Sequence, residues 1–201
     1  MAGRRAGMKP LALAVLAYLL ERPMHPYELG KLLRQRDKQQ SIAYKHASLY
    51  MVVGQLRRDG YITEHETGRD GQRPERTVYR LTDAGRAALR GRMRELVSRP
   101  VKEYRYFEAA LALIMALPPA EVADLLAQRQ RELSEQAEAL REFVAGARER
   151  DVDRLFLVEH EYRLALIEAE QRFTERFRAL ILERRPDFGR LWYELHHGSG
   201  P

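Results

Sequence analysis

The sequence predicts a mainly α-helical protein in which an N-terminal helix-turn-helix and a two-stranded hairpin precede an all-helical C-terminal region. The first observation is the stretch 46–62, where apolar residues spaced as on one helix face stop at Gly60 and continue into β-branched residues. The second is a glycine-punctuated basic turn at 68–76 between two β-rich runs. The third is that no strand signal follows Pro100.

The elements of the first part follow from helix caps and apolar spacing. A first helix is expected over residues 10–20, ending before Pro23. A second opens at Pro26, because proline fits the first position of a helix, and Glu28 lies in its first turn. Two strands and a fourth helix capped by Thr82 or Asp83 follow, the strands over 61–67 and 77–81. The apolar side of the fourth helix is expected to comprise Leu89, Met93, Leu96 and Val97.

The third helix, which begins at residue 46 and stops at Gly60, has one apolar face and one face of small and polar residues. The apolar face has i, i+3, i+4, i+7 spacing and comprises Leu49, Val52, Val53 and Leu56. The opposite face carries Ala47, Tyr50, Met51, Gly54 and Arg58, flanked by Ser48 and Gln55. Its small residues would let a base edge approach closely. A helix with this outer face, followed by a basic hairpin, is the layout of a winged helix-turn-helix that reads DNA.

Beyond Pro100 the sequence predicts helices over 104–117 and 120–148, a long helix capped by Asp151 or Asp153, and a tail helix around 191–195. The two long helices carry narrow apolar seams: Val122, Leu125, Leu126, Leu133, Leu140, Phe143 and Val144 in the first, and Leu155, Phe156, Tyr162, Leu166, Phe173, Phe177, Leu180 and Ile181 in the second. Such seams favour an arm that pairs with a second copy of the chain, the alternative being a bundle within one chain.

The composition restricts the chemistry and points to a polyanionic partner. The 201 residues include no cysteine, which excludes disulfides, thiolate metal sites and cysteine nucleophiles. Residues 1–100 hold 20 Lys and Arg against 10 Asp and Glu, whereas residues 101–201 hold 15 against 19. This asymmetry indicates that the first part meets nucleic acid and the second does not. Asparagine is absent, so bidentate recognition of adenine would have to come from glutamine.

The N-terminus also has some features of an export signal. Arg4 and Arg5 precede an apolar run at 11–20, as in a twin-arginine signal. Ten apolar residues are too few to span a bilayer, which takes about 20, and no small-x-small cleavage site follows. A basic arm over residues 1–9 ahead of an amphipathic helix is therefore expected, in a cytoplasmic protein without membrane contact.

The sequence gives little support for an enzyme, a cofactor or a metal. It has no glycine-rich phosphate loop. The segment that begins at His160 has Leu164 where a zinc-protease helix needs its second histidine. His196 and His197 would diverge by about 100° on a helix and could not easily share a metal.

The front half resembles the PadR family of transcriptional regulators. The resemblance rests, in chain order, on His25-Pro26-Tyr27-Glu28-Leu29, Ala47-Ser48-Leu49-Tyr50, Gly60-Tyr61-Ile62 and the wing stretch 71–85. By length and pattern, the rear half is similar to the family branch with a long helical dimerisation domain. The resemblance implies a homodimeric repressor that binds an inverted-repeat operator in double-stranded DNA, often near its own promoter, and dissociates when a small molecule binds.

The expected DNA contacts lie at the second helix, on the third helix and on the wing: Tyr27, Lys45, His46, Ser48, Tyr50, Met51, Gln55, Arg58, Arg69, Gln72, Arg73 and Arg76. Tyr50 can pack its ring on a sugar and bond to a phosphate. Lys45 and Ser48 lie near a helix start, where backbone N–H groups favour a phosphate. Arginines on the wing suit minor-groove insertion or phosphate pairing.

The sequence thus predicts a basic arm over 1–9, a winged-helix domain over 10–99 and a helical dimerisation and effector domain over 100–201. A small aromatic effector is expected where the two domains meet, at Tyr104, Tyr106, Phe107, Trp192 and Tyr193. The alternative for these rings is that they lock the tail helix in place. The alternative function is a helical adaptor whose winged helix binds protein, which the charge asymmetry disfavours.

Overall fold

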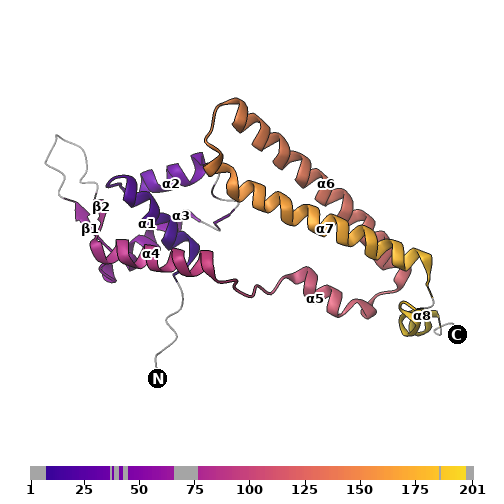
Figure 1. Ribbon diagram of the computed structural model, residues 1–201. Helices are drawn as coiled ribbons and strands as arrows, with labels where there is room; N and C mark the ends of the chain where they lie inside the picture. The colour runs from indigo at the N-terminus through magenta and orange to yellow at the C-terminus, as the bar shows by residue number, and fades with distance from the viewer. Residues whose placement is uncertain are drawn as a thin grey trace, which may run out of the picture. The chain divides into compact units, whose positions relative to one another are not determined.

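A computed structural model of the chain (Figure 1) describes residues 8–36, 38, 41, 42, 45–65, 77–185 and 187–197. The chain divides into two compact units, 1–102 and 103–201. The first contains α1 (Pro10–Glu21), α2 (Pro26–Gln35), α3 (His46–Arg58), β1 (Ile62–His65), β2 (Val78–Leu81) and α4 (Asp83–Ser98). The second contains α5 (Tyr106–Ala112), α6 (Pro119–Glu149), α7 (Val158–Glu183) and α8 (Arg190–His197). The predicted fold class is therefore confirmed: a helix-turn-helix with a two-stranded hairpin, followed by helices.

Helix α1 is the central helix of the first unit. Apolar residues occupy most of its circumference, and a helix that is apolar nearly all round is stable where other elements cover it. It packs against α3, α4 and β2, and Val15 and Leu16 are fully buried. The apolar run that resembled an export signal is thus a core helix. Among the described residues, no helix is both long and apolar enough to cross a membrane.

Helix α2 begins in the predicted turn because both sides of its cap are satisfied. The Nδ1 atom of His25 accepts a hydrogen bond from the Tyr27 N–H at 3.1 Å, and the Glu28 carboxylate accepts one from the His25 N–H at 3.3 Å. Pro26 occupies the first helical position, where no N–H is needed. Leu29 and Leu33 then anchor the helix in the core.

The ends of α1 and α2 are joined by an ion pair. Arg36 donates to both carboxylate oxygens of Glu21, at 2.6 and 2.9 Å, and its guanidinium lies 5.0 Å from the centre of the Tyr18 ring. The hydrogen bond from Arg36 lowers the pKa of Glu21. The pair is partly exposed, so its contribution to folding is on the order of 1 kcal/mol or less.

Strands β1 and β2 form the base of the wing. They pair antiparallel with Ile62 opposite Leu81 and His65 opposite Val78. The described strands are shorter than the predicted ones: Tyr61 precedes β1, and residues 66 and 67 lie outside the described part. A third segment joins the sheet, because Met24 and Tyr79 exchange two backbone hydrogen bonds of 3.0 Å each.

Helix α4 starts against the loop that follows α3. Thr82 is its N-cap: the Oγ1 atom accepts from the Gly85 N–H at 3.0 Å and donates to the Gly60 carbonyl at 2.7 Å. The predicted apolar side of α4 is correct for Leu89, which is buried, and wrong for the rest. Three residues are exposed because the core of the first unit ends near Leu89: Met93, Leu96 and Val97.

Helices α6 and α7 form an antiparallel hairpin in the second unit, side by side along most of their length (Figure 1). From Leu133 the buried residues of α6 recur at alternating spacings of four and three, as in a coiled coil: Leu133, Ala137, Leu140, Val144 and Ala147. Leu126 lies one heptad before Leu133, and Val122 is buried four residues earlier. Ion pairs cross the hairpin at 2.7 Å between Arg141 and Glu168 and at 3.0 Å between Arg148 and Glu161.

The hairpin corrects the expectation that the seam of α6 is covered by a second copy. Helix α7 of the same chain covers it, as in the alternative of a bundle within one chain. Leu125 and Phe143 of the predicted seam are partly exposed instead of buried. The second predicted seam, over residues 155–181, is only partly covered. Ile181 is buried, whereas four of its residues are exposed: Leu155, Phe156, Tyr162 and Phe173.

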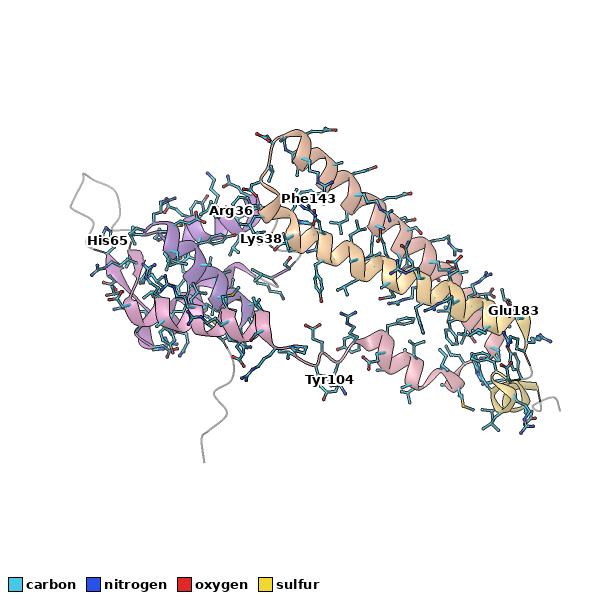
Figure 2. The ribbon with its side chains drawn as sticks, in the orientation of Figure 1. Arg36, Lys38, His65, Tyr104, Phe143 and Glu183 are labelled. Carbon is cyan, nitrogen blue, oxygen red and sulfur yellow. The ribbon has the colours of Figure 1, made fainter. Side chains whose placement is uncertain are left out.

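Helix α5 is shorter than predicted. It covers Tyr106–Ala112 and is followed by a 3₁₀ turn at Ile114–Ala116, so Tyr104 lies on the extended segment ahead of it (Figure 2). Leu117 is extended because residues before a proline avoid the helical region. The Phe107 ring fixes α5 to the hairpin: the Arg129 guanidinium lies 3.8 Å from its centre and the Phe173 ring packs edge-on at 6.4 Å.

Helix α8 is held to the second unit by its aromatic residues. Trp192 is 4% exposed and donates from Nε1 to the Leu117 carbonyl at 2.7 Å. The Tyr193 hydroxyl donates to the Ile181 carbonyl at 2.6 Å. These two bonds connect the tail helix to the segment before α6 and to the end of α7, in agreement with the alternative that these two rings lock the tail helix.

Candidate nucleic-acid interface

The core fixes α3 by its apolar face and leaves the predicted outer face uncovered. Leu49, Val53 and Leu56 are buried against the rest of the first unit, while Val52 is half-buried. The predicted stripe is thus confirmed. Opposite it, Ala47, Tyr50, Met51 and Arg58 are exposed and Gly54 is half-buried. Gly54 adds no side chain to this face, and Nη1 of Arg58 lies 3.6 Å from the position that its Cβ would take.

The start of α3 brings several predicted DNA contacts to one end of the helix. Lys45 is the exposed N-cap, and its carbonyl accepts from the Ser48 N–H at 2.9 Å. Ser48 is half-buried, while Tyr50 and Met51 are 44% and 67% exposed. Tyr27 is also exposed, at the second residue of α2. An ammonium group, a phenol and the backbone N–H groups of a helix start are chemically suited to phosphate oxygens.

The last turn of α3 carries a chain of hydrogen bonds. Arg58 donates from Nη2 to Oε1 of Gln55 at 2.7 Å, and Gln55 donates from Nε2 to Oδ1 of Asp59 at 2.8 Å. The neighbouring Arg57 instead pairs with Glu64 of β1 at 3.1 Å. The sequence prediction omitted Asp59, although its position four residues after Gln55 is a signal for such a bond.

Five predicted contacts are not placed by the structure. Arg69, Gln72, Arg73 and Arg76 lie in the stretch 66–76, outside the described residues. The backbone of His46 begins α3, but its side chain belongs to the part that the structure leaves undescribed. DNA contact by these residues stays a prediction.

The five aromatic residues predicted to bind an effector do not form one cluster within the second unit. Tyr104 and Tyr106 are almost fully exposed, whereas Trp192 is buried. A cavity of about 510 Å³ lies instead beside Trp192, lined mainly by apolar side chains: Leu111, Ile114, Met115, Phe173, Phe177, Phe188 and Leu191. Phe107 borders this region through its contact with Phe173.

The described residues offer no grouping of three or more His, Asp or Glu side chains that could hold a metal ion. The chemistry available on the outer face of α3 is hydrogen bonding and positive charge. Together, the α2–α3 pair and the β1–β2 hairpin define a winged helix-turn-helix, the class of DNA-binding module that the sequence predicted.

Residues 15–91 match the transcriptional regulator PadR-like family. The resemblance stated from the motifs is thereby confirmed for the N-terminal part of the chain. Among curated proteins, no sequence matches the chain.

Solved structures of PadR-like proteins share the fold over most of the chain. PadR of Bacillus subtilis in complex with operator DNA is 20% identical, with a TM-score of 0.68, over 85% of this chain and 98% of that one. The same protein in complex with p-coumaric acid is 19% identical, with a TM-score of 0.65, over 85% of this chain and 98% of that one. The PadR-like regulator BC1756 of Bacillus cereus is 13% identical, with a TM-score of 0.59, over 87% of this chain and 99% of that one.

Proposed function

We propose that the chain is a homodimeric transcriptional repressor that binds an inverted-repeat operator through α3 and the wing and dissociates from it when a small aromatic effector binds. The observation that carries the proposal is the outer face of α3, which is lined by exposed hydrogen-bonding and cationic side chains in a part of the chain that matches the PadR-like family. The DNA-bound structure of the Bacillus subtilis protein supports the same use of the shared fold.

The dimer is supported by apolar surface that one copy leaves uncovered. In the second unit, many large apolar side chains are exposed, among them Leu113, Leu155, Phe156, Tyr162, Leu182 and Leu191. Exposed apolar surface of this extent is typical of a protein interface. A second copy with two-fold symmetry would cover this surface and present two recognition helices to the two halves of an operator.

The test measures binding to a DNA fragment from the chain's own promoter. Fluorescence anisotropy gives the binding constant K at a range of salt concentrations. We expect log K to fall by about 0.9 per log unit of salt for each phosphate neutralised. Lys45→Gln should lower the affinity for all sequences and make this slope shallower by about one unit, because one phosphate contact is lost. Tyr50→Ala should also weaken binding.

Two conservative variants separate contact from folding. Lys45→Arg keeps the positive charge and should restore the salt slope. Tyr50→Phe keeps the ring and loses the hydroxyl, so any remaining defect reports the bond to phosphate. Salt-independent binding, or no binding to promoter DNA in the presence of competitor, would contradict the proposal. The latter result would favour the protein-binding adaptor.

The effector part of the proposal concerns the cavity beside Trp192. Its apolar lining and aromatic walls suit a flat ring with few polar groups. The Bacillus subtilis protein was crystallised with p-coumaric acid, which is therefore the first compound to titrate. We expect a change in Trp192 fluorescence and a parallel loss of operator affinity, because a ligand releases DNA only if it prefers the conformation that binds DNA poorly.

Two phenylalanines provide a matched pair for this titration. Phe173→Ala removes a wall of the cavity and should weaken ligand binding by about tenfold, whereas Phe143→Ala removes a partly exposed ring that does not line it. Fluorescence quenching without any loss of DNA binding would show that the cavity is not the effector site.

A further inference from the structure

Gln55 is the residue of the recognition helix best suited to read a base, and its amide is held at both ends. Nε2 donates to Asp59 and Oε1 accepts from Arg58, at 2.8 and 2.7 Å. A glutamine amide has two N–H groups and two acceptor positions on its oxygen. Each of the two bonds uses one of them, so one N–H and one lone pair are left for a further partner.

The backbone fixes Asp59 as the anchor of this arrangement. Asp59 is the C-cap of α3, and its N–H donates to the carbonyl of Gln55 at 2.9 Å. Gly60 then leaves the helix with φ of +74°, a left-handed conformation that suits glycine. The Asp59 carboxylate is therefore held one turn beyond Gln55, within reach of its side chain.

Arg58 is the third residue of this chain of hydrogen bonds, and it lies beside Gly54. A Cβ atom placed on Gly54 would lie 3.6 Å from Nη1 of Arg58, at ordinary van der Waals distance, so the guanidinium lies close beside Gly54. From there Arg58 donates to Gln55. Arg58 therefore lies on the outer face of α3 between Gly54 and the amide of Gln55.

We propose that Asp59 is a specificity-determining residue that orients the Gln55 amide to read an A·T base pair in the major groove. The inference rests on the proposed DNA-binding function. Adenine presents the N7 acceptor beside the N6 donor, which matches one free N–H and one free lone pair. A freely rotating amide could also offer its NH2 group to the two acceptors of guanine, so holding the amide narrows the choice of base.

The negative charge of the Asp59 carboxylate itself disfavours DNA binding, because it repels the phosphates. Asp59→Ala should therefore bind every duplex at least as tightly as the native chain while choosing less strictly among sequences. Glu95→Gln is the matched control: it also removes one negative charge, from α4, and leaves the chain of bonds on α3 intact.

The experiment is selection of binding sites by the full-length chain from a library of random DNA duplexes, with Gln55→Ala, Asp59→Ala and the double variant in parallel. In each half-site, the native chain should prefer A·T at one base pair by about tenfold. Gln55→Ala and Asp59→Ala should each reduce that preference to about twofold, at the same base pair, with other positions unchanged. The double variant should be no worse than Gln55→Ala.

Each other outcome has a defined meaning. Thermal unfolding is measured for every variant, and a preference lost by a variant that unfolds like the native chain reports recognition. If the native chain selects no sequence, the proposed function fails. If it selects a site and Asp59→Ala keeps every base preference, or loses one at a position that Gln55→Ala does not affect, the function stands and the role of Asp59 is overturned.

Discussion

Replacing Gly85 by alanine is expected to destabilise the first unit by about 3 kcal/mol, the upper range for overpacking a core. A Cβ atom at this position would lie 2.0 Å from the Tyr61 carbonyl oxygen and 2.9 Å from Cδ1 of Leu81. The first of these atoms is backbone and cannot rotate away. The start of α4 would have to separate from the loop after α3, breaking the bonds of the Thr82 cap.

Gly91 on the same helix is the matched control. Apart from the neighbouring backbone of α4 itself, no atom of the described residues lies within 4 Å of the position its Cβ would take. Gly91→Ala should therefore stabilise α4 by about 0.5–1 kcal/mol, because alanine has the higher helix propensity. Thermal unfolding followed by circular dichroism measures both variants. Equal stability of Gly85→Ala and the native chain would mean that α4 does not pack on the Tyr61 carbonyl.

Removing the second unit is expected to lower operator affinity by 10²–10⁴-fold, the range for the loss of a second tethered contact. A chain ending at residue 102 keeps the winged helix and lacks the exposed apolar residues of the second unit. It should sediment as a monomer, and each copy would then bind a half-site alone. Sedimentation velocity and anisotropy with the full operator measure the two effects.

A DNA fragment with a single half-site provides the control for the shortened chain. On that fragment the full-length and shortened chains should bind with similar affinity, because neither can use a second half-site. A shortened chain that stays dimeric at micromolar concentration would place the interface in the first unit, where Met93, Leu96 and Val97 are exposed.

Local signals predicted most of the first unit. Pro26 and Glu28 locate the start of α2, Gly60 the end of α3, and Thr82 the start of α4. Each of these residues acts on backbone groups within a few positions, so the sequence alone contains the information. The exposure of Val97 could not be predicted in this way, because it depends on where the core ends and not on the spacing along α4.

In the second unit, the sequence predicted the helices but not that α6 packs against α7 of the same chain. The apolar seam of α6 has the same pattern whether α7 or a second copy covers it, since both supply an apolar helix at the same distance. Pro118 explains the extended conformation of Leu117, but the residue types around Ala112 do not mark the end of α5 there. In the candidate site, the faces of α3 followed from helical spacing, whereas the bonds among Gln55, Arg58 and Asp59 depend on side-chain conformations.

The two hydrogen bonds between Met24 and Tyr79 have a consequence for how the wing opens. Strand β2 is paired with β1 along one edge and with the turn before α2 along the other. Separating the wing from the core therefore breaks bonds to that turn as well. In native-state hydrogen exchange, the amides of Met24 and Tyr79 should open in one cooperative step. Any strain applied to the wing by a bound duplex would then be transmitted directly to the start of α2.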